Sequence, residues 1–337
     1  GLSSSCGRGM SVFTDRDYHV HHSGSVSKEL IHRWHEEGLI GGEDLFDTHH
    51  DADPPFLSVQ HALQKYRKGL PLVEAYQAPY DSLDDFITMY RAYAPEDLCR
   101  EYTTEICKGL DPRAEIRCSV PPPEGEPLPW AKEAIDTLHF YQENLLPNQR
   151  LVIAFERMFF NNSTHMDHLR ALLSLLQDNA ATIPRPCFDF VSKIYRVPDM
   201  IEVLEEIRKV LPESTVLYHH GEMTSAFSLL DRIQDAERLL PYVNRIGHGI
   251  CLGVAPPGSL ERKEADRILR LYAERGVGIE INPTCNLTLG GASDLSYCKR
   301  FLDHGVNLYL GTDDPGFLNT TLDQEREILE AVLAQGK

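Results

Sequence analysis

Short apolar runs alternate with longer amphipathic stretches along most of this chain. The runs that predict buried strands lie around Tyr18 and Val20 and over 114–118, 150–155, 187–191, 215–218, 245–247, 277–281 and 306–310. Apolar residues at helical spacing predict helices over 130–145, 165–176, 199–211, 224–239, 259–275 and 321–335. Strands that alternate with helices are typical of a parallel sheet. Eight such units predict an α/β protein with the (β/α)8 architecture of a TIM barrel, formed by residues 1–337 as a single domain.

Two segments near the N-terminus stand outside this alternation. Residues 82–94 carry apolar side chains at i, i+3, i+4 and i+7, which predicts a helix that either packs in the core or covers a flat ligand. Residues 41–56 are polar and rich in turn-forming residues. They contain four residues that belong either to a solvated loop or to a second metal site: His49, His50, Asp51 and Asp53.

The composition argues against two classes of protein. The net charge of −18 disfavours binding to polymeric nucleic acid, whose phosphates attract basic patches. No run of 18 apolar residues occurs, so we expect no membrane span. The eight cysteines are scattered and form no C-x-x-C pair, as is typical of free thiols in a reducing compartment. We therefore expect a cytoplasmic protein that acts on a small molecule.

Histidines and a carboxylate follow several predicted strands, at the end of a barrel where active sites lie. His19 and His21 alternate on the first strand, so their side chains point to the same side. His219 ends the fifth predicted strand and Asp313 follows the eighth. Three imidazoles and one carboxylate suit Zn²⁺, which leaves a position for a water molecule whose pKa the cation lowers. The sequence thus predicts one zinc ion per chain, bound by these four residues.

Two further residues at the same ends are suited to move protons. Glu222 lies three residues beyond His219, where a carboxylic acid can deliver a proton to a substrate without binding the metal. His248 follows the sixth predicted strand and can orient or deprotonate the water. A single His or Asp at a strand end is usually only hydrogen-bonded. The joint placement of such residues on four strand ends points to catalysis.

The motifs around these residues resemble the adenosine deaminase family of metal-dependent hydrolases. His19-Val20-His21 with Gly24 is similar to the family's first motif, and HHGE at 219–222 is similar to its H-A-G-E motif. Four more segments resemble the family's sixth-strand motif, seventh-strand segment, T-D-D-P motif and lid: 245–250, 282–290, 311–315 and 82–93. The motifs occur in the family's order and extend over nearly the whole chain.

This resemblance implies a zinc-dependent deaminase that converts the adenine base of adenosine, AMP or ATP to hypoxanthine and releases ammonia. It implies the same four metal ligands, with Glu222 protonating N1 of the purine while C6 is attacked. His248 would act on the attacking water. Asp314 would hydrogen-bond the purine, and Gly24 would lie at the substrate-binding site. The expected ligand is a purine nucleoside or nucleotide.

The chain departs from the family pattern after the fourth predicted strand. The family commonly has a glycine-containing acidic turn there that contacts the purine, whereas this chain has Ser192 and Lys193, which become candidate substrate-binding residues. Basic residues near the early strand ends form either a cationic rim for phosphates or ion pairs with carboxylates such as Glu115 and Glu156. These basic residues are Arg117, Arg157, Lys193 and Arg196.

The ends of the chain suggest a piece of a larger protein. It has no initiator Met, and it stops soon after the eighth predicted strand, where the family normally continues with further helices. We therefore expect a domain truncated or excised at one or both ends. The CRISPR-associated adenosine deaminases, in which a sensor of cyclic oligoadenylates is fused to a deaminase acting on ATP, give the hypothesis of an effector domain in antiviral defence. Under this hypothesis, the chain has a second copy of itself or a fused sensor domain as its partner.

Two other functions stay open at this point. One is a barrel hydrolase of the same superfamily with two metals bridged by a modified lysine, a role that Lys193 could fill. The other is a catalytically silent regulatory relative, against which the retention of every proposed ligand and of Glu222 argues.

Overall fold

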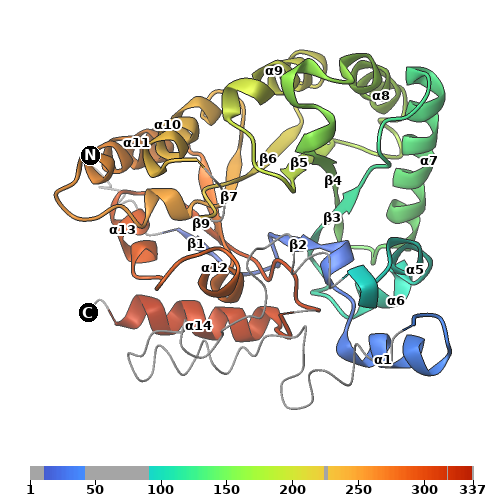
Figure 1. The fold of residues 1–337 in the computed structure, drawn as a ribbon, viewed down its shortest axis with the longest axis horizontal. Coiled ribbons are helices and arrows are strands. Elements are labelled where there is room, and N and C mark those ends of the chain that lie inside the picture. Colours follow the sequence, from blue (N-terminus) through green and yellow to red (C-terminus); the bar gives the residue numbers. More distant parts are fainter. Residues whose placement is uncertain (1–10, 42–90, 224–226, 317, 336–337) are drawn as a thin grey trace, which may run out of the picture.

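The computed structural model of the protein describes residues 11–41, 91–223, 227–316 and 318–335. Nine strands form one sheet in the order β1-β9-β8-β7-β6-β5-β4-β3-β2, and all neighbours are parallel. The strands are β1 (Val12–Phe13), β2 (Val20–His21), β3 (Glu115–Ser119), β4 (Arg150–Glu156), β5 (Cys187–Val191), β6 (Thr215–His220), β7 (Arg245–His248), β8 (Gly278–Ile281) and β9 (Leu308–Leu310). In Figure 1 they occupy the middle of the molecule.

The two ends of the sheet meet, because β1 and β2 both lie beside the last strand. β1 pairs with β9 at Val12 and Leu308, and a further parallel bridge joins Val20 to Asp313, just beyond β9. The backbone N–H of Asp313 donates to the carbonyl of His19. β1 and β2 therefore act as two pieces of one first strand. The predicted (β/α)8 barrel is confirmed, with that strand interrupted.

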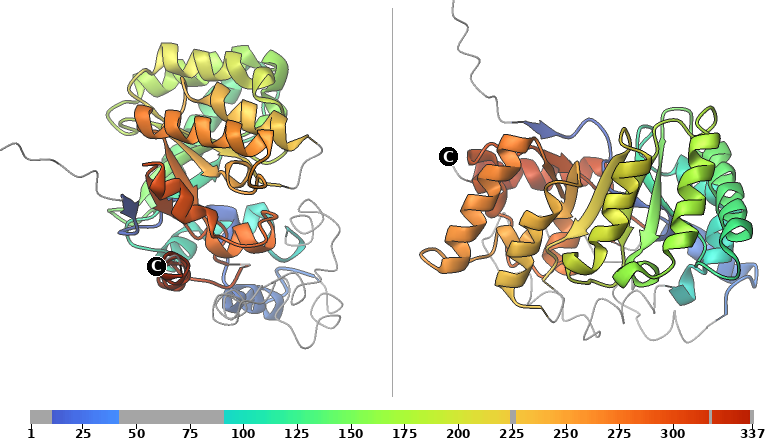
Figure 2. Two further views of the ribbon diagram at one scale, coloured as in Figure 1. Left: turned by 90° about the vertical axis from the view of Figure 1, so that its left-hand side faces the viewer. Right: turned by 90° about the horizontal axis from the view of Figure 1, so that it is seen from above.

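Helices cover the outer face of this sheet, as Figures 1 and 2 show. The six predicted between strands or at the C-terminus are present: α7 (Pro127–Asn144), α8 (Met166–Asp178), α9 (Ile201–Val210), α10 (Leu229–Leu239), α11 (Leu260–Arg275) and α14 (Leu322–Ala334). The described residues also form α1 (Lys28–Glu36), α5 (Glu96–Glu101), α6 (Thr103–Lys108), α12 (Pro283–Thr288) and α13 (Tyr297–Asp303). The four short helices α5, α6, α12 and α13 were not predicted, because six or seven residues carry little periodicity.

Alternate residues of each strand face either the helices or the interior of the barrel. On β4, Leu151, Ile153 and Phe155 belong to the large core under the helices. Val152 instead belongs to a separate small cluster with Cys187 and Leu217 from the next two strands. The positions that share this inward phase include buried charged residues: Glu115, Arg117, Asp189, Arg245 and Glu280. The interior of the barrel is therefore charged as well as apolar.

Two predicted segments lie wholly or mostly outside the described residues. These are the polar stretch 41–56, with its histidines and aspartates, and most of the lid helix at 82–94. Among the helices that the structure describes, none is long and apolar enough to cross a membrane.

One buried carboxyl group ties the C-terminal helix to the barrel. Glu325 of α14 accepts a hydrogen bond from the backbone N–H of Thr284 (3.1 Å) and another from the hydroxyl of Thr320 (2.9 Å). The side chain is fully buried, and loss of hydration raises its pKa to about 7. The carboxyl therefore keeps its proton in the folded chain at pH values where the unfolded chain has lost it.

We predict that Glu325 lowers stability as pH rises. Between the ordinary pKa of 4.5 and about 7, the folded state holds one proton more than the unfolded state, so the free energy of unfolding falls with pH. Glu325→Gln should remove this loss and be the more stable chain at pH 8, by up to about 3 kcal/mol. Urea unfolding at pH 5 and pH 8 measures the effect. The exposed Glu330→Gln on the same helix is the control, and equal pH slopes for the two variants would contradict the prediction.

Candidate metal centre and active site

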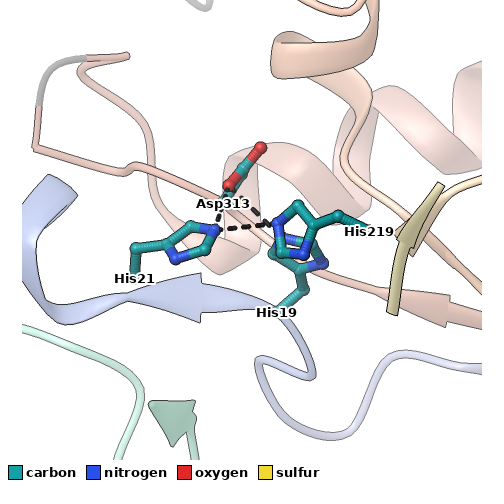
Figure 3. A group of neighbouring side chains, drawn as sticks. All are labelled: His19, His21, His219 and Asp313. Atoms are coloured by element: carbon teal, nitrogen blue, oxygen red, sulfur yellow. Dashed lines mark hydrogen bonds and ion pairs between the residues drawn. The ribbon is translucent and has the colours of Figure 1, made fainter. Parts of the chain in front are cut away.

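Four side chains from distant parts of the chain meet at one mouth of the barrel (Figure 3). His19 and His21 come from the first strand, His219 from the end of β6, and Asp313 from the turn after β9. One ligand atom of each lies within 4.8 Å of all the others. The Oδ1 atom of Asp313 is 3.3 Å from Nε2 of His19 and 3.1 Å from Nε2 of His21. Nε2 of His21 is also 3.1 Å from Nε2 of His219. The ligand set named from the sequence is thus brought together.

The hydrogen bonds of the histidines fit a metal ion. Nδ1 of His19 donates to Glu280 (2.8 Å) and Nδ1 of His219 donates to Asp189 (3.1 Å), an assignment that leaves both Nε2 lone pairs facing the centre. Nε2 of His19 is buried and has no hydrogen-bond partner. Ligands about 2.0 to 2.1 Å from zinc are about 3.3 Å apart along the edge of a tetrahedron, close to the measured separations.

A network of buried charges lies directly beneath these histidines. Arg117 donates to Asp189 through Nε (2.9 Å) and to Glu280 through Nη2 (2.8 Å). Arg245 donates to Glu280 (2.8 Å) and to Glu115 (2.7 Å). Although burial alone would raise them, the arginines and histidines hold the pKa values of Asp189 and Glu280 well below the ordinary range. Both carboxylates are therefore ionised acceptors for the ligand histidines.

The sequence reasoning missed this network, although a signal for it exists. Asp189 and Glu280 are the single charged residues in the otherwise apolar strands CFDFV and GIEI. A lone charge at an inward position of a buried strand needs a partner inside the barrel. The partners could not be named, because Arg117 and Glu280 are 163 positions apart in the chain.

The ligand side chains differ in protonation. Burial lowers the pKa of His219 to about 3, so its imidazole is neutral, as a metal ligand must be. Burial and Arg117 also lower the pKa of His19, but Asp313 and Glu280 outweigh them and raise it to about 9. Although burial opposes it, the positive charge of His19 holds the pKa of Asp313 well below its usual value. A cation at the centre therefore competes with the proton on His19.

Glu222 and His248 lie beside the ligands. Nε2 of His248 is 3.5 Å from Oε1 of Glu222 and 3.8 Å from Oδ2 of Asp313. Nδ1 of His248 donates to Oδ1 of Asn286 (2.9 Å), whose own amide nitrogen donates to the hydroxyl of Tyr297 (3.0 Å). With the Asn286 oxygen as acceptor, His248 carries its proton on Nδ1 and turns the Nε2 lone pair toward the site, while the amide nitrogen of Asn282 lies 3.4 Å from the same Nδ1. Asn286 was not singled out from the sequence.

Three of these strand ends have a backbone conformation that is unfavourable for residues other than glycine. Ser192, His248 and Asp313 have φ values of 69°, 73° and 63°. Such residues cost about 1 to 3 kcal/mol each and persist where their surroundings fix them. At Asp313 and His248 the turn directs the side chain into the mouth instead of along the strand.

The two predicted substrate contacts Gly24 and Asp314 touch each other. A Cβ atom on Gly24 would lie 1.8 Å from Oδ1 of Asp314, so only glycine leaves room for this carboxyl group. Loss of hydration and the charge of Asp313 raise the pKa of Asp314 well above its ordinary value. This environment favours the protonated form of Asp314, which can donate a hydrogen bond.

The two candidate substrate-binding residues after β5, Ser192 and Lys193, have other contacts than Gly24 and Asp314. Ser192 donates weakly to Glu156 (3.4 Å), and its carbonyl accepts from Arg157 (2.6 Å), which also donates to the carbonyl of His219. Lys193 places Nζ 5.6 Å from the centre of the Tyr195 ring.

The other basic residues at the early strand ends are engaged by acidic or carbonyl groups. Arg196 pairs with Asp235 (2.8 Å) and Asp231 (3.4 Å). Arg117 and Arg157 are buried in the contacts given above. The ion-pair alternative therefore holds for Arg117 and Arg196. Arg117 pairs with Asp189 and Glu280, and Arg196 pairs with two aspartates, whereas the partners expected from the sequence are Glu115 and Glu156.

Comparison with known sequences gives one family. Residues 187–335 match the family model described as adenosine deaminase. The chain is 34% identical to an adenine deaminase of Rhizobium johnstonii over 120 residues, which are 35% of this chain and 33% of that protein. It is 32% identical to an adenosine deaminase of Vibrio parahaemolyticus over 115 residues, 34% of this chain and 30% of that protein. The chain thus spans about a third of the length of these curated relatives.

Solved structures share the fold over nearly the whole chain. The N6-methyl-AMP deaminase of Arabidopsis thaliana has a TM-score of 0.59 at 15% identity, covering 96% of this chain and 87% of the other. The Arabidopsis protein ADAL in complex with IMP has a TM-score of 0.57 at 16% identity, covering 95% and 86%. The family model covers β5 to α14, which carry His219, Glu222, His248 and Asp313. Residues 187–335 of this chain therefore resemble the adenosine deaminase family, and the solved structures share its fold.

Proposed function

We propose that this chain hydrolyses the amino group from an adenine base, with about one zinc ion per chain held by His19, His21, His219 and Asp313. The observation that carries the proposal is the meeting of this donor set with Glu222 and His248 at one barrel mouth. A divalent cation in such a site supplies Lewis acidity and a water molecule of lowered pKa.

The other residues have separate parts in the proposed reaction. Glu222 donates a proton to a ring nitrogen of the purine, so that the ring accepts electrons as the carbon bearing the amino group is attacked. His248, with its Nε2 lone pair fixed by Asn286, accepts a proton from the attacking water. Asp314, a neutral acid against Gly24, donates to a second ring nitrogen and orients the base. The bond from the ring carbon to the amino group then breaks as His248 passes its proton to the departing nitrogen, and the new hydroxyl returns a proton to Glu222, so that ammonia and hypoxanthine are formed.

The substrate class is an adenine base, nucleoside or nucleotide. The proteins to which the chain is similar include an adenine deaminase, an adenosine deaminase and an N6-methyl-AMP deaminase. Ser192 and Lys193 are proposed to contact the part of the substrate beyond the base. The effector hypothesis, with a fused sensor domain or a homo-oligomer, adds ATP as a substrate. The described cysteines form no disulfide, in keeping with a cytoplasmic location.

A substrate panel tests the function itself. We expect a change in ultraviolet absorbance for at least one compound of the panel, with release of ammonia from adenine, adenosine, AMP or ATP and of methylamine from N6-methyl-AMP, and loss of both signals with a chelator. No turnover of any of them by the zinc-loaded chain would refute the proposal. Turnover of adenosine far above that of ATP would reject the CRISPR-associated assignment alone. Two zinc ions bound tightly in a fully active chain, with Lys193 required for the second, would favour the two-metal hydrolase.

Glu222→Gln separates proton donation from metal binding. The substitution keeps the size of the side chain but removes the acidic proton, so turnover should fall by about 10³-fold or more. Zinc content, measured by atomic emission, should stay at the wild-type level. Asp313→Ala should lose both zinc and turnover. Near-normal turnover in Glu222→Gln would show that another group donates the proton.

Glu280→Gln tests whether the charge network sets metal affinity. Loss of the ionised acceptor for His19 should weaken zinc binding by about 10- to 100-fold, measured by competition with a chromogenic chelator. Glu115→Gln is the matched control, because Glu115 contacts Arg245 in the same network but no ligand histidine. Both variants should lose stability in thermal unfolding without zinc. Equal zinc affinities in the two variants would mean that Glu280 only stabilises the fold.

A further inference from the structure

A second group of potential metal ligands adjoins the first. Glu222, His248 and Cys285 each place one ligand atom within 4.8 Å of the other two. We propose that these three residues bind a second, soft divalent cation of the Zn²⁺ or Cd²⁺ class, and that this cation inhibits the enzyme. The inhibition rests on the proposed function of Glu222 and His248, whereas the binding does not.

The thiol reaches this position through α12, which begins directly after β8. Cys285 lies in the first turn of α12, and its side chain is 3% exposed. The next residue, Asn286, holds Nδ1 of His248 and so leaves Nε2 free on the side of Glu222. A hydrogen bond at the non-ligating nitrogen is the usual arrangement of a metal-binding histidine. One helix therefore supplies the thiol and orients the imidazole.

Asp313 connects the two groups. Its Oδ1 atom faces His19 and His21 at 3.3 and 3.1 Å, whereas its Oδ2 atom is 3.8 Å from Nε2 of His248. A carboxylate whose two oxygens face two ligand groups can bridge two cations. The second site is thus an extension of the first and not a separate surface feature.

The charges around Cys285 favour a cation. Three carboxyl groups, those of Asp313, Glu222 and Asp314, lie close enough to Cys285 to act on its charge. A bound soft cation takes a cysteine as its thiolate and displaces the thiol proton. Thiolate, imidazole and carboxylate together select borderline or soft ions over Mg²⁺ and Ca²⁺. Such an ion would occupy the two groups that move protons.

Cadmium titration tests the site by a signal that only a thiolate gives. The full chain carries Cys6→Ser, because Cys6 lies outside the described residues, and is first loaded with one equivalent of Zn²⁺. Added Cd²⁺ should bind as a second equivalent, produce the ultraviolet thiolate-to-cadmium band, and suppress turnover of the best adenine compound. Replacement of zinc at the first site gives no such band, since that site has only nitrogen and oxygen ligands.

Cys285→Ser in the same background should abolish the band and weaken second-equivalent binding by about 100-fold. Cys298→Ser, a buried cysteine of α13 in the main core, is the matched control and should keep both. A band that persists in Cys285→Ser, or a second equivalent that raises turnover, would overturn the proposal. Because band and stoichiometry are read without substrate, an inactive chain would refute the proposed function and leave this test intact.

Discussion

The structure depends on a cluster of charges buried inside the barrel. Arg117 and Arg245 share Glu280, and the remaining donors of each arginine reach Asp189 or Glu115. Removing one partner of a buried ion pair costs about 3 to 5 kcal/mol, because the other charge is left uncompensated. The cluster therefore stabilises the barrel only when all of its charges are paired. What it provides is two fixed, ionised carboxylates directly below His19 and His219.

The contacts that close the barrel also bring the proposed metal ligands together. The bridge between Val20 and Asp313 joins the first strand to the last, and the residues around it are His19, His21 and Asp313 themselves. The donor set is incomplete until the two ends of the sheet meet. Asp313 can turn into the mouth because its φ of 63° leaves the strand conformation, which an aspartate tolerates better than most residues.

Much of the fold and the site could be predicted from the sequence, for reasons that differ by element. Most strands from β4 to β9 are short, largely apolar runs, and α8 repeats leucines at helical spacing, so local patterns suffice. His19, His21, His219 and Asp313 follow such runs, which places them at the mouth. The pairing of Arg117 with Glu280 depends on register between distant strands, which no local pattern encodes. Cys285 and Asn286 lie in a helix of six residues, too short to have been expected.

The adjacent Asp313 and Asp314 show how environment gives one residue type two roles. His19 and His21 face the first carboxylate and stabilise its charge, although burial opposes it. The second lies against Gly24, where burial and the charge of Asp313 outweigh the opposing charge of Arg91 and favour its protonated form. Two carboxyl groups whose pKa values are pushed apart can serve as a ligand and a hydrogen-bond donor in the same site. Of the two, the residue with the left-handed backbone is the proposed ligand Asp313, whose φ is 63°.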